Sequence, residues 1–74
     1  MRYDMEYVIL LEKTSTGYSA HSPDIEGCVA VGETREETIQ LMKEALEFHI
    51  KNLQRDGEPI PEASSIATSI DLAI

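Results

Sequence analysis

One cysteine and one histidine are the side chains that could pair as a nucleophile and its base. Cys28 is the single cysteine of this 74-residue chain, and His21 stands seven positions before it. Thiolate catalysis also needs an acid that orients the histidine and a site that binds the oxyanion, and the surrounding sequence shows neither. A buried thiol and a strand histidine explain the two residues, so we expect no catalytic residue.

Carboxylates form the second candidate site, because several of them on one sheet can hold two divalent ions for phosphodiester cleavage. The candidates are Glu6, Glu12, Asp24 and Asp71. Glu6 and Glu12 share a strand face but lie six residues apart, about 20 Å at the rise of a strand, which is too far to bind one metal pair. Asp71 could reach them only if the last strand pairs with the first in a suitable register. We expect these acids to be solvated and to hold no metal.

The sequence shows no other pattern for binding a cofactor. Two histidines and one cysteine at unrelated spacings do not match a zinc site. Gly27 and Gly32 flank a predicted strand instead of opening a phosphate-binding loop. We therefore expect no cofactor.

The composition is strongly acidic, with 14 Asp and Glu against 6 Lys and Arg and a net charge of −8. Binding the phosphate backbone of a nucleic acid needs clustered Lys and Arg, so this net negative charge argues against direct nucleic-acid binding. It favours a basic protein partner, although an acidic surface that only maintains solubility explains it equally well. The acids between residues 22 and 37 make Asp24, Glu26 and Glu33 the candidate partner-contact residues, and Glu33 also suits a helix N-terminus.

One long helix is the best-supported element that could position these groups. Thr34 is a favourable N-cap, and Glu37 three residues later completes a capping box. Apolar residues then recur every three or four positions, at Ile39, Met42, Leu46, Ile50 and Leu53, with Leu41, Ala45 and Phe48 widening the stripe. Gly57 and the prolines after it end the helix at Asp56. The pattern predicts a helix that lies across a broad apolar surface.

Alternating and apolar runs predict four strands around this helix. They are Met5–Glu12, Tyr18–Ser22, Cys28–Val31 and Ile66–Ile74, with a turn at 13–17 and a loop at 22–27. The order β-β-β-α-β and the right-handed crossover rule predict an α+β fold, with a four-stranded mixed sheet and the helix on one face. We expect residues 1–74 to form one domain.

Apolar side chains also point to the sheet face that the predicted helix does not cover. Val8 and Leu10 of the first strand are the clearest examples. Because an exposed apolar face of this size normally marks an interface, we expect a homodimer or higher oligomer that packs through that face or a strand edge.

From the sequence we expect neither a membrane-spanning segment nor a signal peptide. No apolar run approaches the roughly 20 residues that span a bilayer, and the first residues do not open a signal peptide. A single cysteine suits a reducing compartment. We expect a cytoplasmic, soluble protein without membrane contact.

Several segments resemble the HicB-like antitoxin family, in its single-domain UPF0150 form. Residues 18–28 read YSAHSPDIEGC, and residues 32–37 read GETREE. The pattern MKEAL at 42–46 and the segment DGEPIPE at 56–62 look like the family too. The combination of Pro-x-x-x-Gly-Cys, Gly-x-Thr-x-x-Glu and a long helix is fairly specific, and the resemblance covers nearly the whole chain.

That resemblance implies a partial ribonuclease-H-like fold whose catalytic carboxylate set is absent or incomplete, and therefore no enzymatic activity. It implies the antitoxin of a type II toxin–antitoxin pair that neutralises a small, basic, mRNA-cleaving HicA-like toxin by direct contact. Many family members carry a C-terminal ribbon-helix-helix or helix-turn-helix segment that binds DNA. This sequence stops within or just after the fourth predicted strand, so we expect no direct DNA binding by this chain.

Two other functions stay open at this point. An oligomeric domain of the same family that has no toxin could serve a regulatory or scaffolding role. A small basic open reading frame beside the gene would distinguish the antitoxin from that domain. A divalent-metal nuclease with vestigial ribonuclease-H chemistry would require magnesium-dependent cleavage of RNA that is lost when Glu6 or Asp71 is mutated.

Overall fold

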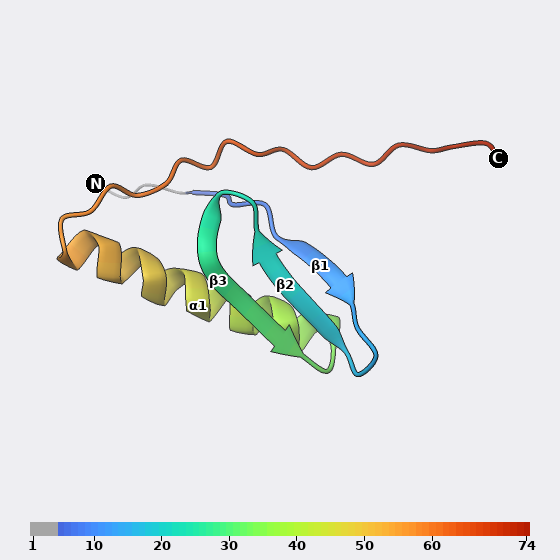
Figure 1. Cartoon of the computed structure of the whole chain (residues 1–74), viewed down its shortest axis with the longest axis horizontal. Helices are drawn as coiled ribbons and strands as arrows, with labels where there is room; N and C mark the ends of the chain where they lie inside the picture. Colours follow the sequence, from blue (N-terminus) through green and yellow to red (C-terminus); the bar gives the residue numbers. More distant parts are fainter. Residues whose placement is uncertain (1–4) are drawn as a thin grey trace.

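An antiparallel sheet of three strands packs with one face on a long helix (Figure 1). The computed structural model describes residues 5–74, and its elements are β1 (Leu10–Lys13), β2 (Tyr18–Ser22), β3 (Ile25–Gly32) and α1 (Arg35–Arg55). β2 lies in the middle of the sheet, and α1 packs mainly on β3 and secondarily on β2. This arrangement confirms the predicted α+β class, with the helix on one sheet face.

The turn between β1 and β2 lies where the sequence predicts it. The backbone N–H of Thr14 donates to the carbonyl of Gly17 at 2.8 Å, and the Thr14 hydroxyl accepts the Gly17 N–H at 3.0 Å. Gly17 also lies directly against the backbone of Gly32, where a Cβ would collide with the Gly32 carbonyl oxygen. Only glycine fits this close approach between the hairpin and the end of β3.

The first strand is shorter than predicted. Its ladder begins at Leu10, opposite His21, and not at Met5. Continuing this register would set Val8 opposite Pro23, which has no N–H to donate to a ladder. Residues 5–9 therefore lead into β1 without joining the sheet.

The connection between β2 and β3 is tighter than the predicted loop at 22–27. Pro23 and Asp24 alone form the turn, and β3 begins at Ile25, three residues before the predicted start at Cys28. The pairing register shifts beside this turn, and Gly27 takes a φ of 84°, a left-handed conformation that costs glycine little. Proline and glycine usually indicate loops, so the sequence pattern concealed the start of the strand.

Both ends of α1 confirm the predicted capping. The Thr34 hydroxyl accepts the Glu37 N–H at 3.1 Å, and the Glu37 carboxylate accepts the Glu33 N–H at 3.0 Å. The reciprocal bond thus reaches the residue before the cap and not the cap itself, a variation on the capping box. At the other end Gly57 has a φ of 68° and its N–H donates to the carbonyl of Gln54 at 3.2 Å, which closes the helix.

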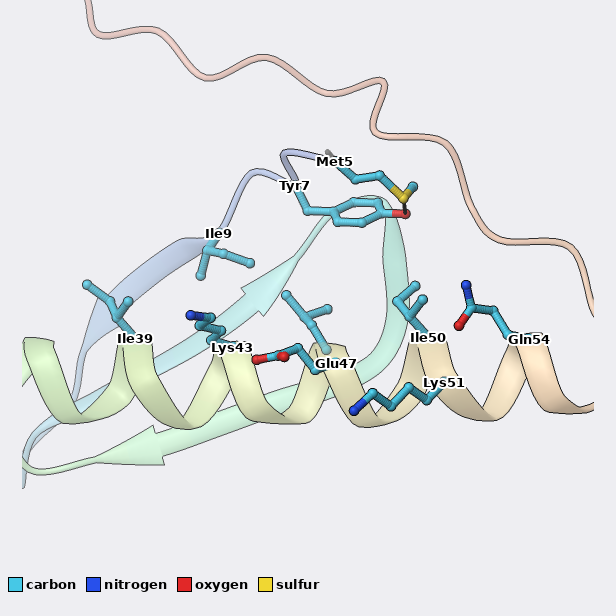
Figure 2. Close-up of a pocket in the computed structure, with 10 residues that line it drawn as sticks. Met5, Tyr7, Ile9, Ile39, Lys43, Glu47, Ile50, Lys51 and Gln54 are labelled. Carbon is cyan, nitrogen blue, oxygen red and sulfur yellow. Dashed lines mark hydrogen bonds between the residues drawn. The ribbon is translucent and has the colours of Figure 1, made fainter. Parts of the chain in front are cut away.

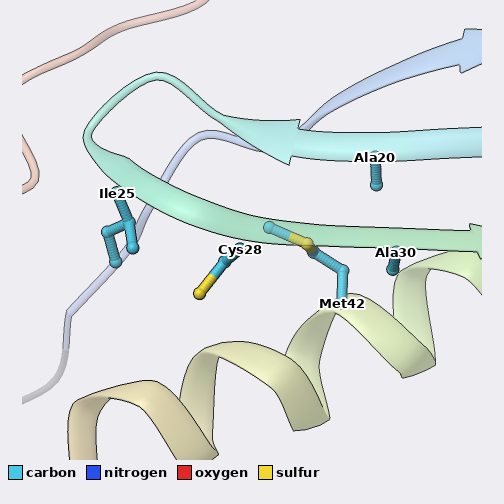
Figure 3. Packing of buried hydrophobic residues seen from close by; sticks show 5 residues of the cluster. All are labelled: Ala20, Ile25, Cys28, Ala30 and Met42. Carbon is cyan, nitrogen blue, oxygen red and sulfur yellow. The ribbon is translucent and has the colours of Figure 1, made fainter.

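Small side chains build most of the core between the sheet and α1 (Figure 3). The buried hydrophobic residues are Ala20, Ile25, Cys28, Ala30 and Met42. Ala20 and Ala30 are paired across β2 and β3, so the helix can approach the sheet closely there. Figure 3 shows Met42 reaching from α1 toward the strands between Cys28 and Ala30, a role that its flexible side chain suits.

The predicted apolar stripe of α1 is only partly covered. Leu46 and Ile50 pack at the margin of the core, but Ile39 and Phe48 remain 44% and 69% exposed. Three strands cover less of the helix than four strands would. The broad apolar surface predicted for α1 therefore exists, with part of it open.

The last segment, residues 58–74, does not pair with the sheet, and its end extends beyond the folded part of the chain (Figure 1). Among residues 5–74 the sheet thus has three strands, and the predicted fourth strand Ile66–Ile74 is not part of it. The side chains of Ile66, Ile70 and Leu72 are 92%, 78% and 77% exposed. Apolar and polar residues do alternate in this segment, but the folded part of the same chain does not bury the apolar side chains.

No helix within residues 5–74 combines the length and the apolar character that crossing a bilayer requires.

Candidate partner-binding surfaces

Asp24, a predicted partner-contact residue, binds a distant part of its own chain. Its carboxylate accepts the backbone N–H of Ser65 at 2.9 Å, the Ser65 hydroxyl at 2.8 Å and the Ser64 hydroxyl at 3.2 Å. The bond from the Ser65 backbone, followed by the serine hydroxyls, holds the pKa of Asp24 below its ordinary value. The residue is therefore an anchor for residues 64–65.

A second anchor holds the same segment a few residues earlier. The hydroxyl of Tyr7 donates to the carbonyl of Pro61 at 2.5 Å. Burial, and secondarily the negative charge of Asp24, raises the pKa of Tyr7, so the phenol stays protonated as a donor. Together Tyr7 and Asp24 fasten residues 61–65 at the end of the sheet where β2 turns into β3. Sequence reasoning missed both anchors, since each bond spans 40 residues or more.

The other two predicted contact residues, Glu26 and Glu33, lie on or beside an edge strand. β3 pairs with β2 alone, so its outer edge is open among residues 5–74. Glu26 and Glu33 are exposed near its two ends, and Val29 and Val31 between them are 68% and 67% exposed. We call these four residues the β3 strip. Its apolar centre between two acids resembles a protein-binding surface.

The sheet face opposite α1 carries one of the two predicted interface residues in an exposed position. Leu10, His21 and Val29 form one cross-strand row, and the next row, which includes Ala20 and Ala30, points to α1. Leu10 is 42% exposed on this outer face, while Val8, before β1, is half-buried. The outer face is thus apolar near Leu10 and Val29, as the sequence predicts.

A groove runs between α1 and the segment that leads into β1 (Figure 2). Its volume is about 530 Å³, and its apolar walls come from Met5, Tyr7, Ile9, Ile39, Leu46 and Ile50. Lys43, Glu47, Lys51 and Gln54 of α1 line it as well. We call it the α1 groove. The sequence did not indicate it, because its walls come from two segments that only the fold brings together.

The side chains considered for catalysis are not assembled into a site. Cys28 is buried on the helix side of β3, where burial raises the pKa of its thiol, whereas His21 lies in the outer-face row opposite Val29. The sheet therefore separates the thiol from the imidazole. Among residues 5–74 no group of three or more His, Cys, Asp or Glu side chains is placed to hold a metal ion. Of the carboxylates within that range, Asp24 is the one with several hydrogen-bond partners, and these partners are serines.

Comparison with known proteins identifies the family to which the chain is similar. A family model described as the HicB-like antitoxin of bacterial toxin-antitoxin systems matches residues 7–72. An uncharacterized 14.9 kDa protein of Haemophilus phage HP1 is 37% identical over 67 residues, which cover 90% of this chain and 50% of that protein. A UPF0150 protein of Synechocystis is 36% identical over 69 residues, which cover 92% of this chain and 87% of that protein.

A solved structure gives the same result at the level of the fold. A chain in the HicA3 and HicB3 toxin-antitoxin complex superposes with a TM-score of 0.64 and 36% sequence identity. The match covers 74% of this chain and 64% of that chain, so the chain spans only part of the solved protein, as it spans half of the phage relative. On the family model, the relatives and the shared fold, the chain belongs to the HicB-like antitoxin family.

Proposed function

We propose that this chain is the antitoxin of a toxin–antitoxin pair and neutralises a small, basic, HicA-like toxin by direct contact, without enzymatic activity. The observation that carries the proposal is the match to a chain of the HicA3 and HicB3 complex, at 36% identity over 74% of this chain. Similarity of both backbone and sequence over that span favours a similar mode of partner binding.

The β3 strip is the surface that fits such a toxin best. Val29 and Val31 supply apolar area that a partner can cover, and apolar centres provide most of the affinity of an interface. Glu26 and Glu33 would attract a basic protein and orient it, which affects mainly the rate of association. Asp24 adds its negative charge beside Glu26, while its oxygens remain bound to the serines.

Co-purification with the small basic protein encoded beside the gene tests this proposal. We expect a stable complex that restores growth against the toxin. The double variant Glu26→Lys/Glu33→Lys should weaken the complex by about tenfold or more, equivalent to about 1.4 kcal/mol. Glu58→Lys/Glu62→Lys is the matched control, because it makes the same charge change at two exposed positions beyond α1. The absence of a complex would contradict the proposal. Equal affinity of the Glu26→Lys/Glu33→Lys variant and the control would show that the toxin does not bind at the β3 strip.

We also propose that the chain forms a homodimer or higher oligomer through the outer face near Val8 and Leu10 or through the edge of β1. The exposure of Leu10 beside Val29 supports this interface. In the same proposal residues 1–74 are one cytoplasmic domain, with the partial ribonuclease-H-like architecture that a fourth strand would complete. Sedimentation at micromolar concentration tests the assembly, and a monomer alone would exclude it.

A nuclease activity has no support in the arrangement of the carboxylates. Within residues 5–74 the acids form no metal-binding group, and Asp71 lies in the exposed last segment. We expect no magnesium-dependent cleavage of RNA or RNA–DNA hybrids by the purified chain. Cleavage that disappears in Glu6→Gln or Asp71→Asn would overturn this expectation.

A further inference from the structure

The last nine residues, Ile66–Ile74, have the form of a β-strand without a sheet. Ile66, Thr68, Ile70, Leu72 and Ile74 alternate with Ala67, Ser69, Asp71 and Ala73, so one face is apolar. Among residues 5–74 no hydrogen bond joins this stretch to another element. We call it the tail strand. Its large apolar side chains are among the most exposed of the described chain.

An acceptor for such a strand exists on the same molecule. β1 pairs with β2 on one side alone, which leaves its other edge with unpaired backbone groups among the described residues. The α1 groove lies next to this edge, since Tyr7 and Ile9 lead into β1 and Ile39 comes from α1 (Figure 2). An open edge beside an apolar groove is the arrangement that accepts an added strand, with alternate side chains entering the groove.

The anchors keep the tail strand away from its own groove. Asp24 holds Ser64 and Ser65 at the turn between β2 and β3, and the chain then runs outward (Figure 1). A bend after Ser65 would be needed to bring the strand back, but Ile66–Ile70 contains no Gly, Pro, Asn or Asp, and its Ser69 is a weaker turn former. Its β-branched residues favour a straight, extended backbone.

The charges are compatible with contact between the tail strand of one copy and the α1 groove of another copy. Each chain has a net charge of −8, so most of its surface would repel a second copy. The tail strand carries one charged side chain, Asp71, and the α1 groove presents Lys43 and Lys51 against Glu47. The tail strand and the groove are thus apolar and of opposite net charge.

We propose that two copies exchange their tail strands, each pairing with the β1 edge of the partner copy and placing Ile70 and Leu72 in the partner's α1 groove. The inference rests on the homo-oligomer proposed above and assigns its interface. It is independent of toxin binding. The exchanged strand becomes the fourth strand of each sheet, and its second face continues the outer face that carries Leu10.

Two variants of the full chain separate the donor from the acceptor. Ile70→Asp/Leu72→Asp disables the tail strand, and Ile39→Arg blocks the groove at a side chain that is already 44% exposed. Both sites are solvent-accessible, so the folded monomer should tolerate them, which circular dichroism checks. Matched controls are Ala67→Asp/Ser69→Asp on the other tail face, which adds the same charge, and Phe48→Arg, which is 69% exposed on α1 and does not line the groove.

The measurement is sedimentation of each protein and of mixtures at micromolar concentration. The unmodified chain and both controls should sediment at about twice the 8.3 kDa of one chain, and each blocked variant at 8.3 kDa. Mixing the tail-blocked with the groove-blocked variant should restore dimers, because one intact tail meets one intact groove.

Each alternative gives a different result. If the blocked variants remain dimeric, the exchange is wrong while the homo-oligomer stands. If the unmodified chain is monomeric, the homo-oligomer and the strand exchange are both wrong. Slow hydrogen exchange at the tail amides would then show that the tail strand docks on the sheet of its own chain. If the blocked variants no longer bind the toxin but still self-associate, the α1 groove is part of the toxin-binding site and the exchange is again wrong.

Discussion

The carboxylate of Asp24 accepts both the backbone N–H and the hydroxyl of Ser65, at 2.9 and 2.8 Å, across 41 positions of the sequence. Asp24 lies in the two-residue turn between β2 and β3, so the direction of the last segment depends on a turn of the sheet. Bonds to a charged acceptor are stronger than bonds between neutral groups. This relationship gives Asp24 a structural role that its charge alone did not indicate.

Replacing Asp24 with Ala should release the last segment. The Ser65 N–H and both serine hydroxyls would lose their acceptor, while the core under β2 and β3 would stay intact. We expect faster amide exchange at Ser65 and faster proteolysis after Pro61, with exchange in β2 unchanged. Glu26→Ala is the control, because it removes a neighbouring carboxylate that makes no bond to this segment. Unchanged Ser65 exchange in Asp24→Ala would contradict the anchor.

Acid should release the same anchor. Because the folded pKa of Asp24 is lowered by its hydrogen bonds, the anchor contributes stability above the unfolded pKa of about 4. That contribution is lost as the pH falls through the lower folded pKa. We expect the Ser65 amide resonance to titrate with a midpoint below that of an ordinary aspartate, and not to titrate this way in Asp24→Asn. A midpoint at or above the ordinary value would show that the carboxylate is not engaged in solution.

Removing the helix cap should destabilise the fold by a modest amount. Thr34→Ala deprives the Glu37 N–H of its acceptor, which costs about 1 kcal/mol for a typical N-cap. Urea unfolding should show a lower midpoint with an unchanged slope. Thr34→Ser keeps the hydroxyl and should unfold close to the unmodified chain. Equal destabilisation by Ser and Ala would mean that the Thr34 methyl group, and not its hydroxyl, stabilises the fold.

Shortening Met42 should have a larger effect, because this side chain fills the core between Cys28 and Ala30. Met42→Ala leaves a cavity, and such changes cost about 2–5 kcal/mol. In so short a chain this loss can unfold the protein, so Met42→Leu, with an expected cost below about 1.5 kcal/mol, provides a measurable second variant. Leu41→Ala, at a neighbouring exposed position, should change stability by about 0.5 kcal/mol or less. Similar effects at positions 41 and 42 would contradict the observed orientation of α1.

The features that could be predicted from the sequence are those whose cause lies within a few residues. Thr34 and Glu37 cap the helix through neighbouring backbone groups, and Gly57 ends it through its own φ angle, so both boundaries were readable. The turn that ends at Gly17 depends on local bonds in the same way. The motifs around Gly27 and Thr34 also sufficed to indicate the family, and the homologous sequences and fold confirm it.

Contacts between distant segments were decided by the tertiary structure alone. No local signal reveals that Asp24 binds Ser65, and the alternation of Ile66–Ile74 shows a strand without showing what pairs with it. Pro23 shortens β1 only because the sheet register places it opposite Val8. Periodicity reports which side chains share a face, whereas the partner of that face depends on how segments about 40 residues apart are packed together.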